Sequence, residues 1–261
     1  MLSALALALA TQTAPPMATD ARLTVCLEAA RNDPATAIAQ AGEWLGETGS
    51  TGVASAEQCL GTAYTRLLKW EASEEAFVRA REAVPEVLHL RRSRLAAMAG
   101  SAALAGGRPE AALVHFDTAL ADGEATGLDG MTGMISVDRS RALVALDREE
   151  EAAVALERAR REAPQDPQAW LLSATLARRA DDLLAAQSYI QTSSALDPDD
   201  PEIGLEAGVI AVLSGREEAA RQSWQSVLIT ARGTKIAQTA ESYLAQLGDA
   251  PVATSQQETG R

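Results

Sequence analysis

Aromatic side chains are scarce in this sequence. Only four Trp, three Tyr and two Phe occur among 261 residues, although 47% of the residues are hydrophobic. Sheet cores draw on aromatic and β-branched side chains, whereas alanine is the strongest helix former. An apolar fraction this rich in alanine and poor in rings argues against a sheet protein and predicts an all-α fold of closely packed helices.

Positive charge is also in short supply. The 23 Lys and Arg residues face 36 Asp and Glu residues, which leaves a formal net charge of −13 at pH 7. Nucleic acids and anionic lipid surfaces are bound through clustered cations, so neither is expected as the main partner. Disorder over the whole chain is equally unexpected, because nearly half of the residues can leave water.

Residues typical of catalytic sites are few. The two histidines, His89 and His115, do not have a metal-binding spacing such as HExxH. The sequence contains no GxSxG motif, no phosphate-binding glycine loop and no dinucleotide fingerprint. We therefore expect a protein that is not an enzyme and that carries no cofactor or metal.

The N-terminal apolar stretch is short. It runs for nine residues, Leu2 to Ala10, and a helix needs about twenty to cross a bilayer. The stretch fits the core of a secretory signal, although no Lys or Arg precedes Arg22. We predict a signal peptide at 1–18, a periplasmic location and no membrane span in the mature chain. A cytoplasmic protein with an apolar terminus is the alternative.

Only two cysteines are present, Cys26 and Cys59, 33 positions apart and without a CxxC pair. In an exported protein a disulfide between them would stabilise the fold by roughly 3 to 4 kcal/mol in the chain-entropy model. In a cytoplasmic protein they would be two buried, reduced thiols. Both states are compatible with the sequence.

A repeat with a period of 34 residues organises the chain. Positions that recur at this interval are Ala152, Ala186 and Ala220; Pro164 and Pro198; Asp166 and Asp200; and Pro167 and Pro201. This period divides the chain into units at 133–166, 167–200 and 201–234. Two earlier units, 54–87 and 93–126, are each followed by a short insertion of five or six residues.

These units resemble the tetratricopeptide repeat, a 34-residue helical hairpin. The matching residues are Leu60, Gly61, Tyr64, Phe77, Ala80 and Pro85; Gly100, Ala112, Phe116 and Ala119; Ala152, Leu156, Ala159 and Pro164; Trp170, Ala174, Ala186, Ile190 and Pro198; and Gly208, Ala220 and Trp224. The sequence departs from the pattern at Arg139, where leucine is usual, and at Ser73, where alanine is usual.

The resemblance implies an all-α, right-handed solenoid of helical hairpins. Gly61 and Gly100 would allow two helices to cross closely, and Phe77, Phe116 and Trp224 would wedge between successive hairpins. Other segments extend this domain of five repeats, which we place with its closing helix at 54–248. We expect a degenerate helical hairpin at 19–48, a C-terminal capping helix that begins near 236, and a disordered tail at 249–261.

The same resemblance places the first helix of each unit along a concave groove that binds proteins or peptides. The groove candidates in this sequence include Arg66, Arg94, Arg141, Val144, Gln168, Leu171, Thr175, Arg178 and Arg179. Five arginines could receive an acidic or carboxylate-ended peptide, because guanidinium groups bind carboxylates through two parallel hydrogen bonds. Alternatively, these arginines pair with acids on neighbouring helices. We expect an interaction module or scaffold in the bacterial cell envelope, or alternatively a cytoplasmic regulatory or assembly subunit.

Overall fold

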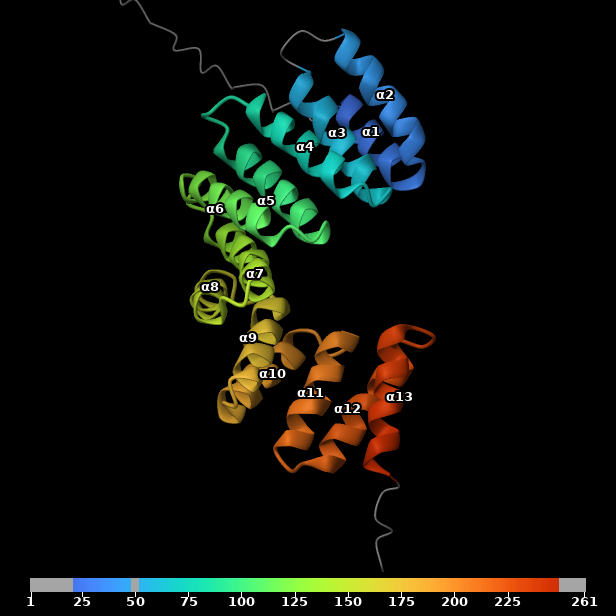
Figure 1. Ribbon diagram of the computed structural model, residues 1–261, viewed down its shortest axis with the longest axis vertical. Coiled ribbons are helices and arrows are strands. Elements are labelled where there is room, and N and C mark those ends of the chain that lie inside the picture. The colour runs from blue at the N-terminus through green and yellow to red at the C-terminus, as the bar shows by residue number, and fades with distance from the viewer. Residues whose placement is uncertain (1–20, 48–51, 249–261) are drawn as a thin grey trace, which may run out of the picture. The chain divides into compact units, whose positions relative to one another are not determined.

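The computed structural model describes residues 21–47 and 52–248, which form thirteen helices (Figure 1). The helices are α1 (Ala21–Asn32), α2 (Pro34–Glu47), α3 (Val53–Arg66), α4 (Trp70–Glu82), α5 (His89–Ala105), α6 (Pro109–Glu124), α7 (Asp129–Ala145), α8 (Glu149–Glu162), α9 (Pro167–Arg179), α10 (Leu183–Leu196), α11 (Pro201–Leu213), α12 (Glu217–Thr230) and α13 (Lys235–Leu247). They fall into two compact units, the first ending at Val84 and the second beginning at Pro85. The signal peptide predicted at 1–18 and the tail predicted at 249–261 lie outside the described residues.

In the first unit, helix α3 is packed against α1, α2 and α4. Helices α1 and α2 occupy the segment in which we expected a degenerate hairpin. Their contact with α3 is made mostly by alanines, including the fully buried Ala30, Ala37 and Ala41. A disulfide joins Cys26 of α1 to Cys59 of α3, with the two Cα atoms 6.0 Å apart.

The second unit consists of four hairpins, α5/α6, α7/α8, α9/α10 and α11/α12, followed by the single helix α13. In each hairpin the two helices pack closely, and the second helix packs on the first helix of the next hairpin. The expected solenoid of tetratricopeptide-like hairpins with a C-terminal capping helix is therefore confirmed.

Close helix crossings explain the pairing of a glycine with an aromatic ring. A Cβ atom added to Gly100 would lie 2.7 Å from the Phe116 ring, and one added to Gly208 would lie 2.1 Å from the Trp224 indole. Phe116 also belongs to a core that includes Leu143 of the next hairpin. The Trp224 ring lies 5.1 Å from the ring of Tyr243 in α13. These two rings join successive elements as predicted.

The two insertions in the repeat lengthen helices. Helices α5 and α7 each contain 17 residues and start about one turn before the repeat boundaries at 93 and 133. Two later helices begin at a capping aspartate: Asp166 accepts a hydrogen bond from the Gln168 N–H, and Asp200 accepts one from the Glu202 N–H.

The closing helix α13 covers the apolar residues of α11. Leu205, Val209 and Val212 pack against a core that contains Ala237 and Ala240 of α13. Helix α11 is apolar over most of its surface for this reason, with Glu202 and Glu206 as its charged residues, since one side faces α12 and another faces α13.

Candidate peptide-binding surface

The first helices of successive hairpins in the second unit, α5, α7, α9 and α11, are neighbours, and together they form what we call the first-helix face. The predicted groove residues from Arg94 to Arg179 all lie on α5, α7 and α9. Arg66 lies on α3 of the first unit, and the structure does not place it with the others.

A mainly apolar pocket of about 170 Å³ opens on the first-helix face between α7, α8 and α9. Its lining residues are Ser140, Arg141, Val144, Leu156, Leu172, Thr175, Leu176 and Arg179. A cavity of about 150 Å³ with apolar walls holds a benzene-sized group. The pocket therefore has room for one leucine-sized or phenylalanine-sized side chain.

Four predicted groove residues line this pocket: Arg141, Val144, Thr175 and Arg179. The prediction missed Leu156, Leu172 and Leu176, which supply much of the apolar wall. Three positions on α9, Leu172, Thr175 and Arg179, share the i, i+3, i+7 spacing of one helical face. This helical spacing was the signal in the sequence that could have identified Leu172 as a pocket residue.

Leu171 was predicted wrongly as a groove residue. Its side chain is only 5% exposed and belongs to a core with Ala174, Ile190 and Ile203. The physical reason is its place on the helix. Leu171 and Ala174 are three residues apart and form the stripe that faces α10 and α11, next to the stripe that lines the pocket.

The arginines at the pocket rim are paired with acids. Arg141 Nη1 lies 2.5 Å from Asp138 Oδ1, and its Nη2 donates a hydrogen bond of 2.9 Å to Gln168 Oε1. Arg179 forms an ion pair with Glu149 of α8. Both guanidinium side chains remain partly open to water, with 36% and 41% of their surface exposed, so a ligand can reach them.

Arg178 faces away from this pocket toward α11. Its Nε and Nη2 donate to the two carboxylate oxygens of Glu206, at 2.6 and 3.2 Å. Arg94, by contrast, is exposed and makes no ion pair with the residues that the structure describes. Three of the five predicted arginines thus pair with acids, as in the alternative derived from the sequence.

Asp138 is the most perturbed carboxylate near the pocket. Burial raises the pKa of Asp138, and its interaction with Arg141 offsets part of that shift. The charge of Asp166 raises the pKa further. The rim of the pocket therefore combines two arginines with a carboxylate whose pKa is raised by partial burial.

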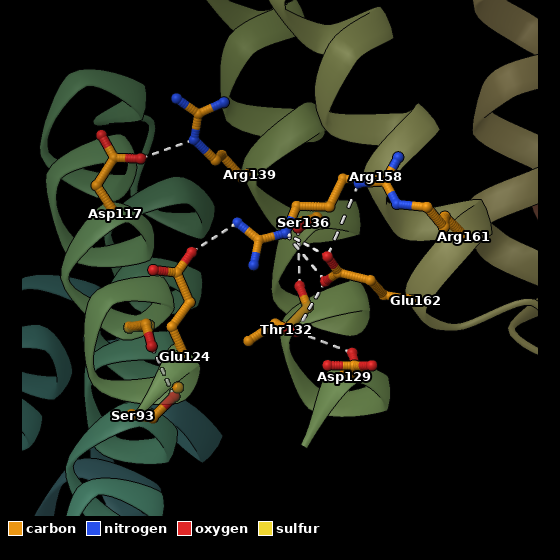
Figure 2. A network of polar contacts seen from close by, with 12 residues as sticks. Ser93, Asp117, Glu124, Asp129, Thr132, Ser136, Arg139, Arg158, Arg161 and Glu162 are labelled. Carbon is orange, nitrogen blue, oxygen red and sulfur yellow. Dashed lines mark hydrogen bonds and ion pairs between the residues drawn. The ribbon is translucent and has the colours of Figure 1, made fainter. Parts of the chain in front are cut away.

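A separate group of charged residues lies between α6, α7 and α8 (Figure 2). Arg139 donates a hydrogen bond of 2.7 Å to Asp117, and Arg158 lies between Glu124 and Glu162. Arg139, which replaces the usual leucine, thus pairs with an acid of the preceding hairpin. These contacts join the hairpin α5/α6 to the hairpin α7/α8.

Within the described ranges, no group of three or more His, Cys, Asp or Glu side chains is arranged to hold a metal ion. Among the helices of residues 21–47 and 52–248, none has the length and apolar character needed to cross a membrane.

No family model and no curated protein matches the sequence. Solved structures do match. The crystal structure of PilW, described as a widely conserved type IV pilus biogenesis factor, has a TM-score of 0.69 and 18% identity, and the match covers 87% of this chain and all of PilW. PilF of Pseudomonas aeruginosa has a TM-score of 0.68 and 16% identity over 86% of this chain and 96% of PilF.

A third match is YrrB, described as a tetratricopeptide-repeat protein with an unusual peptide-binding site. Its TM-score is 0.52 and its identity 16%, over 77% of this chain and 97% of YrrB. Together with the 34-residue period, these matches show that the chain has the tetratricopeptide-repeat fold.

Proposed function

We propose that this protein is a non-enzymatic scaffold that holds a protein or peptide segment on the first-helix face of its second unit. The pocket between α7, α8 and α9 carries this proposal, because it joins a mainly apolar interior to two reachable arginines. Pockets with apolar walls and a few convergent polar groups are the usual sites for ligand side chains. The peptide-binding site of YrrB, a tetratricopeptide-repeat protein of similar structure, supports a similar use of this fold.

The segment that fits this pocket has an apolar side chain next to a carboxylate, as in a chain that ends in leucine. The side chain would enter between Leu156, Leu172 and Leu176. The carboxylate would be received by Arg141 and Arg179 in competition with Asp138 and Glu149. An acidic residue that follows an apolar one would present the same chemistry.

Matched peptides test this recognition. A fluorescent peptide that ends in leucine with a free carboxylate should bind more tightly than the same peptide with a C-terminal amide. Replacing Thr175 by phenylalanine should block the pocket and abolish binding. Thr192→Phe is the control, because Thr192 is also a helical threonine whose hydroxyl donates to the carbonyl four residues before it. Equal binding by the Thr175→Phe variant would refute the site.

The cell envelope is the proposed location. The Leu2–Ala10 stretch, the Cys26–Cys59 disulfide and the similarity to PilW support it. A cytoplasmic regulatory or assembly subunit is the alternative, and it predicts two reduced thiols. Cell fractionation combined with alkylation and mass spectrometry of the native protein separates the two. Affinity capture from the envelope fraction, compared between the wild type and Thr175→Phe, would identify the partner.

A further inference from the structure

The turn between α3 and α4 differs from the equivalent turns of the other hairpins. In the five repeat hairpins from α3/α4 to α11/α12, the second residue after the first helix has a positive φ angle. These residues are Leu68 (57°), Gly107 (72°), Asp147 (56°), Asp181 (60°) and Gly215 (71°). Glycine adopts this conformation freely and aspartate tolerates it, whereas it is strained for leucine. Only the first of these turns places a large apolar side chain there.

Leu68 and its neighbour Leu67 are open to water. Leu68 is 67% exposed and Leu67 is 39% exposed. Neither the strain nor the exposure of Leu68 is explained by packing within the fold. Strained residues that are retained at the surface often serve a function, and adjacent exposed apolar residues mark interaction sites.

Cations flank the two leucines. Arg66 and Lys69 are exposed, and none of the described residues offers an ion-pair partner to either side chain. Trp70 follows as the first residue of α4 and is half-buried. Glu71 is the nearest following acid. The sequence Arg-Leu-Leu-Lys-Trp therefore places two exposed cations and an indole around two exposed leucines.

We propose that this turn, Arg66–Trp70, contacts the surface of an anionic lipid bilayer. Leu67 and Leu68 would enter the boundary between headgroups and acyl chains, and Arg66 and Lys69 would lie at the phosphates. Trp70 would lie at the headgroup level, where indole rings are enriched. The bilayer supplies an apolar layer behind a negatively charged one, and the turn offers exposed leucines for the first and exposed cations for the second.

The net charge of −13 limits the strength of this contact without preventing it. At physiological ionic strength, charges are screened beyond about 8 Å, so most acids of the chain contribute little once the turn touches the membrane. The exposed Glu71, directly after the turn, offsets part of the attraction. The composition of the whole chain argues against lipid as the main partner, but a net charge does not show where cations gather locally, as they do at the Arg66–Trp70 turn. The contact is a weak and reversible one, made in addition to any binding on the first-helix face.

Flotation of the full chain with vesicles tests the proposal. We expect binding to vesicles of phosphatidylglycerol and phosphatidylcholine, weaker binding to phosphatidylcholine alone, and a decline with added salt. Arg66→Gln and Lys69→Gln should each weaken binding by about fivefold, as expected for a cation near an anionic surface. Leu68→Asn should weaken it by roughly tenfold through the loss of apolar contact.

The Leu68→Asn variant also separates lipid contact from folding. Asparagine tolerates a positive φ, so the variant should keep or raise the melting temperature while it loses vesicle binding. Leu184→Asn, at a leucine of α10 that is 82% exposed, is the control and should bind vesicles normally. Thr175→Phe should also bind vesicles normally, which separates this surface from the pocket.

Three results would overturn the proposal. The first is the absence of binding to vesicles that contain phosphatidylglycerol, and the second is unchanged vesicle binding by Leu68→Asn. The third is a wild-type protein that does not bind vesicles but binds a captured protein that the turn variants fail to bind, because the turn would then be a protein-docking surface.

Discussion

Replacing Gly61 by alanine tests how closely α3 and α4 cross. A Cβ atom at this position would lie 2.6 Å from the ring of Phe77, which is only 2% exposed. Carbon atoms in good contact are about 3.5 to 4.0 Å apart, so the rigid ring or its helix must move. Overpacking of this kind costs roughly 1 to 3 kcal/mol, while alanine in place of a helical glycine gains about 1 kcal/mol. We expect a net loss of up to about 2 kcal/mol.

Gly42 provides a matched control in the same unit. It lies within α2, and an added Cβ would meet no atom within 4 Å. Gly42→Ala should therefore stabilise the protein by about 0.5 to 1 kcal/mol. Urea unfolding of the full chain, followed by far-ultraviolet circular dichroism, should shift in opposite directions for the two variants. Equal stabilisation by Gly61→Ala and Gly42→Ala would refute the close crossing.

Three further predictions concern stability. Cys26→Ser should lower the free energy of unfolding by roughly 3 to 4 kcal/mol under non-reducing conditions, and the loss should vanish when a reductant cleaves the Cys26–Cys59 bridge in the wild type. Arg221, 9% exposed, donates hydrogen bonds to the carbonyls of Leu247 and Gly248, so Arg221→Met should cost about 1 to 3 kcal/mol and speed hydrogen exchange in α13. The pKa of Asp138 is raised in the folded state, so protonated Asp138 stabilises the fold below the ordinary aspartate pKa, and this stabilisation is lost as the pH rises through the folded-state pKa. Asp138→Asn should not show this loss when unfolding midpoints are measured over a series of pH values.

The arrangement of the helices was largely predictable because it depends on local chemistry. Pairs such as Asp200 followed by Pro201 start helices by capping their free N–H groups. The interval between Gly208 and Trp224 places a missing side chain opposite a ring within one hairpin. Such features repeat every 34 residues, so each occurrence strengthens the helix positions predicted from the others.

The pocket was only partly predictable, because neighbouring faces of one helix differ by a single residue. Leu171 and Leu172 are adjacent leucines on α9, yet the first is buried in the core and the second lines the pocket. The choice depends on the rotation of α9 against α8 and α10. Sequence periodicity defines that rotation too coarsely to separate the two residues.

Ion pairs between hairpins change the expectation for the partner. Arg178 and Arg179 both bind acids of neighbouring hairpins, so a ligand carboxylate must compete for Arg179 with Glu149. The ligand carboxylate therefore gains little net electrostatic free energy, and the apolar side chain of the ligand must supply most of the affinity for the pocket. Arg66 and Lys69 are exposed and have no ion-pair partner among the described residues, so an outside partner meets no such competition there. Added salt should consequently weaken binding at the α3–α4 turn much more than binding in the pocket, and this difference can be measured on one protein sample.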